Sequence, residues 1–300
     1  MSASKRLTKV FETSKELLID KNSKIVLMSD CHRGVGNWGD NFTNNQNLYF
    51  AALNYYYDNK FTYIELGDGD ELWENRNMDK IIYTHSDAFW LISNLYRAKR
   101  FHMLYGNHDI EKKDLSFRRK YLQSYIDESQ KKRVPLLPGI KIHEGLILTF
   151  KETNHKIFLI HGHQVDFLNY DIWKIARFLV RYLWRPIELL GIRNPTSASD
   201  SFSKKEKIEK KLSDWAQDQQ HILIAGHTHR PVFPEPGKSL YFNDGSCVHP
   251  RCITGIEIEN GNIVLVKWSI RTRTDRSLYV DRVILEGPVA IEKYFIEKLN

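Results

Sequence analysis

Short apolar runs recur along the chain, and each stops at a glycine or at a turn rich in polar residues. Their length and their β-branched and aromatic content are typical of buried strands. The five clearest runs are Lys24–Ser29, Phe61–Leu66, Arg100–Tyr105, Lys156–Ile160 and Ile222–Ala225. This pattern predicts strands that deliver polar side chains to the carboxyl edge of a sheet, where open sheets bind their ligands.

Segments with helical length and spacing alternate with these strands. The predicted helices are Leu48–Tyr57, Met78–Arg97, Lys112–Lys132 and Ser203–Gln219. Further strands are predicted at Ile140–Phe150, Leu240–Phe242, Ile253–Glu259 and Asn262–Ile270, with a hairpin turn at Asn260-Gly261. The alternation followed by a β-rich end predicts an α/β fold with a layered sheet core. We expect one domain over residues 1–300, with residues 166–220 as a helical insertion within it.

The net charge of +7 comes from 44 Lys and Arg residues against 37 Asp and Glu residues. This excess favours anionic partners such as phosphate esters, nucleic acid or acidic lipid, without choosing among them. Cys31, Cys247 and Cys252 are odd in number and lack zinc-finger spacing, which predicts reduced thiols. The chain shows no apolar signal peptide and no stretch of membrane-spanning length. We therefore expect a cytoplasmic protein, with peripheral contact at the inner membrane face left open.

Polar side chains with metal-ligand chemistry follow each of the five strands. They are Asp30, His32, Asp68, Asn107, His108, His161, His227 and His229. Carboxylate oxygen and neutral imidazole suit divalent first-row ions such as Mn, Fe, Zn, Co or Ni. Two such ions about 3.5–4 Å apart would clamp the attacking and leaving oxygens of a displacement at phosphorus. The sequence therefore predicts a site for two metal ions at one edge of the sheet.

The spacing of these residues supports such a site. Asp30 and His32 are two positions apart, so both side chains lie on one side of an extended segment, and the same holds for His227 and His229. Asp68, which follows Gly67 at the end of a strand, is the expected centre. Its carboxylate could bridge the two ions, with one oxygen to each. Each motif alone is weak or moderate, and the prediction depends on their occurrence together, each behind an apolar strand.

The set of motifs resembles that of the calcineurin-like metallophosphoesterases over residues 24 to 250. The motifs are Asp30-X-His32, Gly67-Asp68-X-X-Glu71, Gly106-Asn107-His108-Asp109, His161-Gly162 and Gly226-His227-X-His229. The resemblance implies a two-sheet β-sandwich flanked by helices, with two divalent metal ions at one edge. Mn is the first expectation, and Fe, Zn, Co and Ni are the alternatives.

The resemblance also implies a role for each residue of the motifs. The metal ligands would be Asp30, His32 and His229 for one ion, Asn107, His161 and His227 for the other, and Asp68 between them. His108 would contact the phosphoryl group and help to protonate the leaving oxygen. Asp109 would orient the His108 ring.

Three neighbouring residues are predicted less directly. Arg33 could hold a phosphate oxygen with its guanidinium, although an ordinary surface arginine is an equal alternative. His163 could replace His161 as a ligand, but His161 directly precedes Gly, as in the family, so His163 is assigned with Asn107 to substrate contact. The family often has Asp where this chain has Glu71, which leaves the role of Glu71 open.

The segment 172–185 differs from the rest of the chain. Lys174, Arg177, Arg181 and Arg185 have helical spacing and form one basic stripe, and the other residues are apolar or aromatic. Such a helix would suit the surface of an anionic membrane or cover a lipid-linked substrate. The alternative is a buried helix with Trp173 and Trp184 in a core. The insertion, with Glu71 and Trp73, also resembles the cap of UDP-2,3-diacylglucosamine pyrophosphatases, but those enzymes usually carry Arg where this chain has His108.

These observations predict a metal-dependent phosphoesterase that hydrolyses a phosphate ester or pyrophosphate bond with a metal-bridging hydroxide. The substrate would be a phosphorylated small molecule, a nucleotide sugar or a lipid-linked phosphate. A nuclease is one alternative, but no basic groove with stacking residues is evident. A non-catalytic scaffold on the same fold is another, and it conflicts with a ligand set in which every position is filled.

Overall fold

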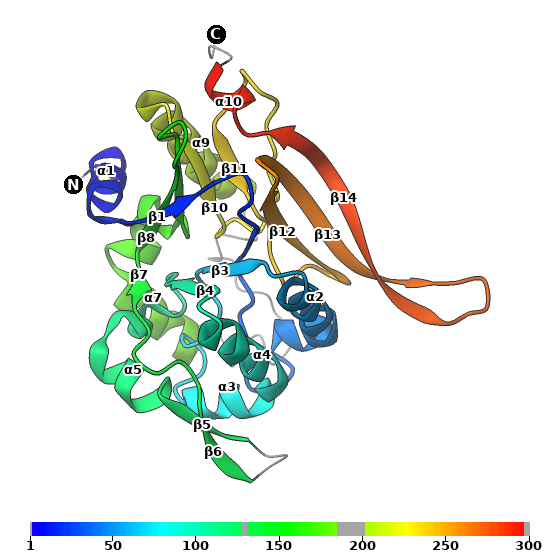
Figure 1. The fold of residues 1–300 in the computed structure, drawn as a ribbon. Coiled ribbons are helices and arrows are strands. Elements are labelled where there is room, and N and C mark those ends of the chain that lie inside the picture. The colour runs from blue at the N-terminus through cyan, green and yellow to red at the C-terminus, as the bar shows by residue number, and fades with distance from the viewer. Residues whose placement is uncertain (1, 128–130, 185–201, 297–300) are drawn as a thin grey trace.

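The computed structural model describes residues 2–127, 131–184 and 202–296. Two β-sheets face each other at its centre, and helices cover the outer face of each sheet (Figure 1). This is the layered α/β sandwich that the sequence predicted.

The larger sheet has the strand order β14-β13-β12-β2-β3-β4-β7. Its strands are β2 (Ile25–Met28), β3 (Thr62–Leu66), β4 (Phe101–Leu104), β7 (Ile142–His143), β12 (Cys252–Glu259), β13 (Asn262–Thr272) and β14 (Leu278–Ala290). The strands β2, β3, β4 and β7 are parallel. Their carboxyl ends therefore lie at one edge of the sheet.

The smaller sheet has the order β1-β8-β9-β10-β11. Its strands are β1 (Lys15–Ile19), β8 (Gly145–Phe150), β9 (Lys156–Ile160), β10 (Ile222–Ala225) and β11 (Tyr241–Asn243). The strands β9, β10 and β11 are parallel. A separate hairpin pairs β5 (Ser124–Asp127) with β6 (Lys132–Pro135).

Alternate residues of β2 enter two different cores. Ile25 and Leu27 pack between the sheets, whereas Val26 and Met28 belong to the core under the helices of the larger sheet. Successive side chains of a strand point to opposite faces. Burial of both faces explains why this strand is an uninterrupted apolar run in the sequence.

Helices α2 (Gln46–Asp58) and α4 (Ser86–Arg97) cover the larger sheet, and α1 (Ala3–Thr13) and α9 (Phe202–Gln219) cover the smaller one. The remaining helical elements are η1 (Asn41–Asn45), α3 (Met78–Thr84), η2 (Ile110–Lys113), α5 (Leu115–Tyr121), η3 (His163–Val165), α6 (Phe167–Tyr170), α7 (Trp173–Leu179), the π-helical turn η4 (Val180–Trp184) and α10 (Lys293–Ile296). In the part of the chain that the structure describes, no helix has the length and apolar character needed to cross a bilayer.

Two predicted helices are interrupted in the structure. The predicted helix Met78–Arg97 divides into α3 and α4 at the buried His85, whose Nε2 lies 3.0 Å from the Asp40 carboxylate. The segment Lys112–Lys132 contains the end of η2, then α5 and β5, and its residues 128–130 lie outside the described residues. Within the predicted insertion, residues 185–201 also lie outside them.

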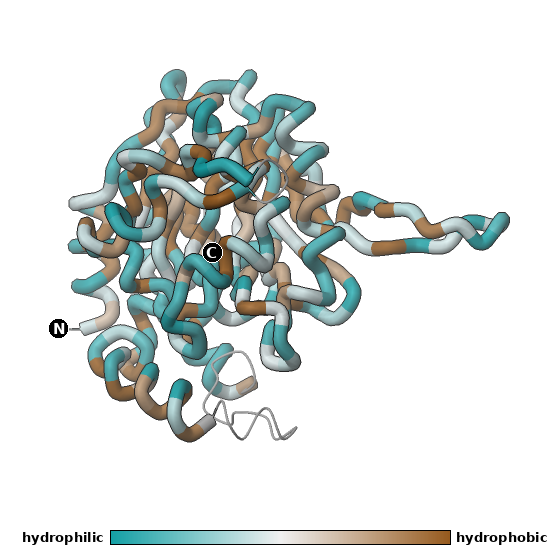
Figure 2. Tube along the Cα trace, turned by 90° about the horizontal axis from the view of Figure 1, so that it is seen from below, coloured by the Kyte–Doolittle hydropathy of each residue, from teal (hydrophilic) through white to brown (hydrophobic). Residues whose placement is uncertain are grey.

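The strands β13 and β14 continue beyond the body of the molecule as a two-stranded arm (Figures 1 and 2). Trp268 lies at the base of this arm, is buried, and donates a hydrogen bond from Nε1 to the Tyr56 hydroxyl at 2.9 Å. Ile270 and Leu278, farther out, are exposed.

Candidate metal centre

The loops after five parallel strands meet at one edge of the sandwich. Asp30 and His32 follow β2, Asp68 follows β3, and Asn107 and His108 follow β4. From the smaller sheet, His161 follows β9, and His227 and His229 follow β10. The Asp30 N–H donates to the Gly67 carbonyl at 3.1 Å, and the His32 N–H donates to the Asp68 carbonyl at 2.9 Å. These bonds hold the first two loops together.

The backbone of these loops is unusual. Five candidate ligands lie in the left-handed region, with φ of 52° at Asp30, 47° at His32, 50° at Asp68, 68° at His227 and 55° at His229. Residues other than glycine rarely adopt this conformation, and where they do it often marks a functional site. The turns therefore aim the side chains inward at a conformational cost that the surrounding structure must offset.

Gly67 fills a position that no other residue could occupy without a shift of its neighbours. Its φ is +96°, and a Cβ atom there would lie 2.7 Å from the Gly106 nitrogen and 2.9 Å from the His161 Cβ. The glycine lets the β3 and β4 loops approach each other, which brings Asp68 next to Asn107 and His108.

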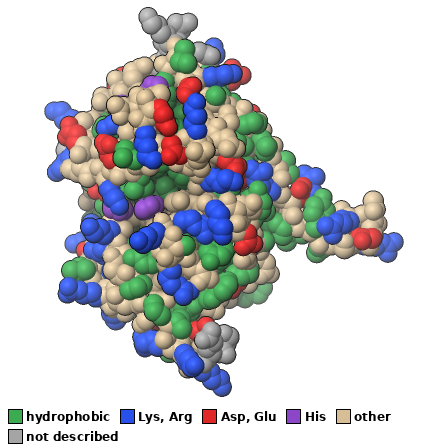
Figure 3. Space-filling model, in the orientation of Figure 1, with side chains coloured by type: hydrophobic (Ala, Val, Ile, Leu, Met, Phe, Trp, Pro, Cys, Tyr) green, Lys and Arg blue, Asp and Glu red, His purple; other side chains and the backbone are tan. Residues whose placement is uncertain are grey.

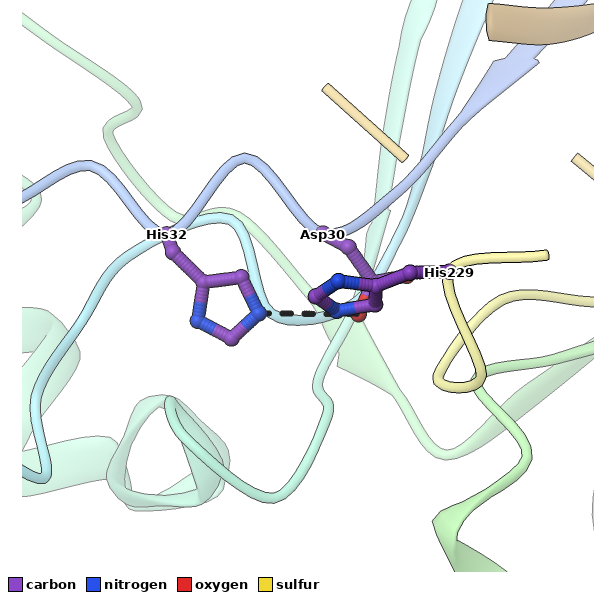
Figure 4. A group of neighbouring side chains, drawn as sticks. All are labelled: Asp30, His32 and His229. Carbon is purple, nitrogen blue, oxygen red and sulfur yellow. Dashed lines mark ion pairs between the residues drawn. The ribbon is translucent and has the colours of Figure 1, made fainter. Parts of the chain in front are cut away.

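Asp30, His32 and His229 form a first group of potential ligands (Figure 4). The Asp30 Oδ1 atom lies 3.0 Å from His229 Nε2 and 3.6 Å from His32 Nε2. Both rings point toward the same carboxylate, although they come from different sheets. Three ligand atoms of the types preferred by first-row divalent ions thus converge on one point.

Asp68, His161 and His227 form a second group. The Asp68 Oδ2 atom lies 3.0 Å from His161 Nε2 and 3.9 Å from His32 Nε2, so it faces both groups. The other oxygen, Oδ1, accepts a hydrogen bond from the His108 N–H at 2.8 Å. Asp68 thus lies between the two groups, where its carboxylate would serve both ions, and the division of its two oxygens between them stays a prediction.

The fit of this set to metal ions can be judged from its unpaired polar atoms. Five buried atoms of candidate ligands form no hydrogen bond of normal geometry, although Asp30 Oδ1 and His161 Nε2 each lie 3.0 Å from another candidate ligand: Asp30 Oδ1, His32 Nε2, Asn107 Oδ1, His161 Nε2 and His227 Nε2. A buried polar atom without a partner is costly, and native structures contain few. Five such atoms at one place fit a site for metal cations, because the cations would be the partners of these atoms.

The charges of the site agree with this interpretation. Burial raises the pKa of the Asp68 carboxyl, but the nearby rings of His161 and His108 outweigh it, and the pKa falls below its ordinary value. Burial lowers the pKa of His161, but Asp68 and Asp30 outweigh it and raise the pKa to about 9. Carboxylates that favour a proton on His161 would equally favour a metal cation there.

The ring orientations are set by neighbouring acceptors. The His161 Nδ1–H donates to the Leu66 carbonyl at 3.0 Å, which leaves Nε2 to bind a metal. The His32 Nδ1 lies 2.8 Å from the Glu71 carboxylate, with the same consequence for its Nε2. Such bonds fix the tautomer of a metal-binding histidine.

Glu71, rather than Asp109, holds the His108 ring. The His108 Nδ1 atom lies 2.7 Å from Glu71 Oε2, and its ring stacks on Trp73 with centroids 4.4 Å apart. Asp109 instead accepts hydrogen bonds from the N–H groups of Gly106 and Gly69 and pairs with Lys112 at 2.7 Å. The predicted role of Asp109 as the partner of His108 is therefore wrong, because its carboxylate joins two loops.

The structure also contradicts the prediction that Arg33 holds a phosphate oxygen. Its side chain is fully buried, with Nε donating to Asp70 at 2.7 Å and Nη2 lying 2.9 Å from Glu65. Lys112 completes the cluster, 2.6 Å from the second Asp70 oxygen. Arg33 thus belongs to a buried ionic cluster beneath the metal centre and does not reach its open face.

His163 lies beside the second group. Its ring is buried between those of Tyr170 and His161, with centroid distances of 5.7 and 5.4 Å, and both of its nitrogens lack a hydrogen-bond partner. Burial and the positive charges of His161 and His227 lower the pKa of His163, which favours the neutral ring. Asn107, also buried, presents its amide oxygen to the centre.

Two carboxylates near the centre were not predicted. Asp166 lies 3.7 Å from His227 Nε2, and Asp244 Oδ1 lies 2.8 Å from the Ser29 hydroxyl, which also contacts Asp30. Asp244 follows β11 in an Asn-Asp-Gly turn. It therefore has the same strand-then-turn signal as the predicted ligands, and that signal could have found it.

The chain is similar to known proteins in sequence and in fold. Residues 23–231 match the family described as calcineurin-like phosphoesterase. No curated protein matches the sequence significantly. Among solved structures, Vps29 of Chaetomium thermophilum aligns with 12% identity and a TM-score of 0.39, over 90% of this chain and 100% of that chain. Vps29 of the same organism complexed with a RaPID-derived cyclic peptide aligns with 12% identity and a TM-score of 0.35, over 89% and 98%.

Proposed function

Because the chain belongs to the calcineurin-like phosphoesterase family, we propose that it is a metal-dependent hydrolase of phosphate ester or pyrophosphate bonds. The observation that carries the proposal is the pair of neighbouring ligand groups, one of which contains Asp68, with buried ligand atoms that form no hydrogen bond of normal geometry.

The proposed ligands divide between two ions. Asp30, His32 and His229 would hold one ion, Asn107, His161 and His227 would hold the other, and Asp68 would lie between them. Two divalent ions there, of which Mn is the first candidate, would polarise the phosphoryl oxygens and lower the pKa of a water molecule toward neutrality. The protein's part is to hold the ligand atoms and to fix their tautomers.

His108 is the proposed acid for the leaving oxygen. Part of its ring is exposed, unlike the rings of His161 and His163. With Nδ1 directed at Glu71, Nε2 is the nitrogen that remains to face a substrate. A protonated ring held in this way can give a proton to the oxygen that departs from phosphorus. Glu71 thus positions both the ligand His32 and the acid His108.

We favour a small or lipid-linked phosphate over nucleic acid as the substrate. On the face shown in Figure 3, Lys and Arg side chains are interspersed with Asp and Glu side chains. A protein that follows a nucleic-acid backbone needs a row of cations along a groove.

Hydrolysis of p-nitrophenyl phosphate and bis-p-nitrophenyl phosphate tests the proposal. We expect Mn-dependent release of nitrophenol that a chelator abolishes, and the preferred substrate distinguishes a monoesterase from a diesterase. Asp68→Asn should lose bound metal and activity together. Asp275→Asn, a matched change in the exposed turn of the arm, should lose neither. A folded protein that binds no divalent metal would overturn the proposal.

A further inference from the structure

The segment that precedes residue 185 presents its apolar side chains to solvent. Seven large residues of α6, α7 and η4 have exposed fractions between 40% and 63% and are called here the outer apolar surface: Phe167, Leu168, Ile175, Phe178, Leu179, Tyr182 and Leu183. In Figure 2 this segment runs into the grey trace and is brown along much of its length. A helix on the surface of a globular protein ordinarily turns such residues toward the core.

Two arginines of the predicted basic stripe face the body of the protein. Arg177 pairs with Glu111, and Arg181 donates to the carbonyls of Leu72 and Trp73 at 2.6 and 2.7 Å. The arginines therefore fasten the segment to η2 and to the loop after β3. Arg185, the last member of the predicted stripe, lies outside the described residues.

Other cations border the outer apolar surface. Arg76 lies over the Tyr182 ring at 5.4 Å, and Lys113 and Lys174 lie over the Trp173 ring at 5.9 and 5.8 Å. All three are exposed, and residues 172–184 contain no acidic residue. Apolar side chains bordered by cations match the interface of an anionic bilayer, with acyl chains beneath and phosphates above.

The outer apolar surface lies next to the metal centre. Arg181 binds the carbonyl of Trp73, and the Trp73 ring stacks on His108, the proposed acid. We propose that the outer apolar surface docks on anionic lipid bilayers and brings the metal centre to the phosphate of a membrane-resident amphiphile. The docking rests on the surface alone, whereas the substrate class rests on the proposed function.

Co-sedimentation with vesicles tests the docking. The probes are vesicles of phosphatidylcholine alone and vesicles that also contain phosphatidylglycerol, with chelator present so that no catalysis is required. We expect the full chain to bind the anionic vesicles. The double variant Ile175→Asp, Phe178→Asp should lose about tenfold or more of this partitioning. The double variant Ile270→Asp, Leu278→Asp carries the same charge on exposed residues of the arm and should bind like the wild type.

A second pair of variants tests the cations. Arg76→Gln with Lys174→Gln should weaken binding to the anionic vesicles and reduce its salt dependence, while apolar contacts remain. Circular dichroism and metal content verify that each variant is folded.

Two outcomes would overturn the docking. One is a wild-type chain that binds neither kind of vesicle. The other is an Ile175→Asp, Phe178→Asp variant that binds as well as wild type. A mass by light scattering that falls from dimer to monomer in that variant would instead assign the surface to a second copy. A folded protein that binds no divalent metal would overturn the proposed function and leave the vesicle result standing.

Discussion

Two carboxylates of the candidate metal centre, Glu71 and Asp68, serve two partners each. Glu71 contacts both His32 and His108, and Asp68 accepts the His108 N–H while its other oxygen faces two histidines. Burial raises the pKa of Glu71, but His108 outweighs it, and the pKa falls to about 2. Glu71 is therefore ionised under any condition in which the protein would work.

Glu71→Gln tests the assignment of the partner of His108. The amide keeps the shape of the side chain but removes the charge that orients the His108 ring, so kcat should fall about 10²-fold at saturating Mn. Saturating metal is needed because Glu71 also contacts His32, and loss of such a contact lowers metal affinity about 10–100-fold. Glu12→Gln, at an exposed site on α1, is the matched control. Wild-type kcat in Glu71→Gln would refute the assignment.

Arg33→Met tests whether Arg33 is structural. The change leaves the negative charges of Asp70 and Glu65 buried with less positive charge beside them. Breaking such a pair lowers the free energy of unfolding by about 3–5 kcal/mol. Urea denaturation measures this loss. Arg276→Met removes the same charge from the exposed tip of the arm and should change stability by less than about 0.5 kcal/mol. A raised KM with full stability would restore Arg33 to the substrate site.

The contrast between these residues shows what local sequence can reveal. The residues that the structure brings together as potential ligands, such as Asp30 and His161, each follow an apolar strand directly, so their position could be predicted. Arg33 and Asp109 occupy the same motifs, yet their side chains turn away toward Asp70, Lys112 and backbone N–H groups. Those partners belong to other loops, and no spacing within one motif encodes them.

Among the strands, those buried on both faces could be predicted from the sequence, and two strands at the sheet edges could not. Strands such as β2 and β10 are buried on both faces and therefore read as continuous apolar runs. By contrast, β1 lies at the edge of the smaller sheet with mostly exposed or half-buried residues, and β14, at the edge of the larger sheet, contains Gly287-Pro288. Neither carries a strong periodic signal, and neither was predicted.

Trp268 anchors the arm, and its removal should be costly. Trp268→Ala deletes a buried ring that packs on Tyr56 and donates to its hydroxyl, so the free energy of unfolding should fall by about 3–5 kcal/mol. Ile270→Ala, two residues farther out on the same face, removes an exposed side chain and should cost less than about 0.5 kcal/mol. Chemical denaturation compares the two. Similar small losses in both would show that the arm is not anchored in this way.

On the scale of the whole molecule, two sheets must be packed together before the centre exists. Asp30, His32 and Asp68 come from the larger sheet, and His161, His227 and His229 come from the smaller one. The order of strand and helix predicted the layers. The outward orientation of α7 and η4 could not be predicted from the sequence. A helical pattern shows which residues share a face of the helix, but not which face packs on the rest of the protein.

Anomalous scattering from crystals of the Mn-loaded protein tests the central claim most directly. We predict two Mn peaks about 3.5–4 Å apart. One would lie among Asp30, His32 and His229, and the other among Asn107, His161 and His227, with the Asp68 carboxylate between them. A third cluster, of His32, Glu71 and His108, offers ligand atoms at similar distances. A peak in that cluster, or no peak beside Asp68, would contradict the account.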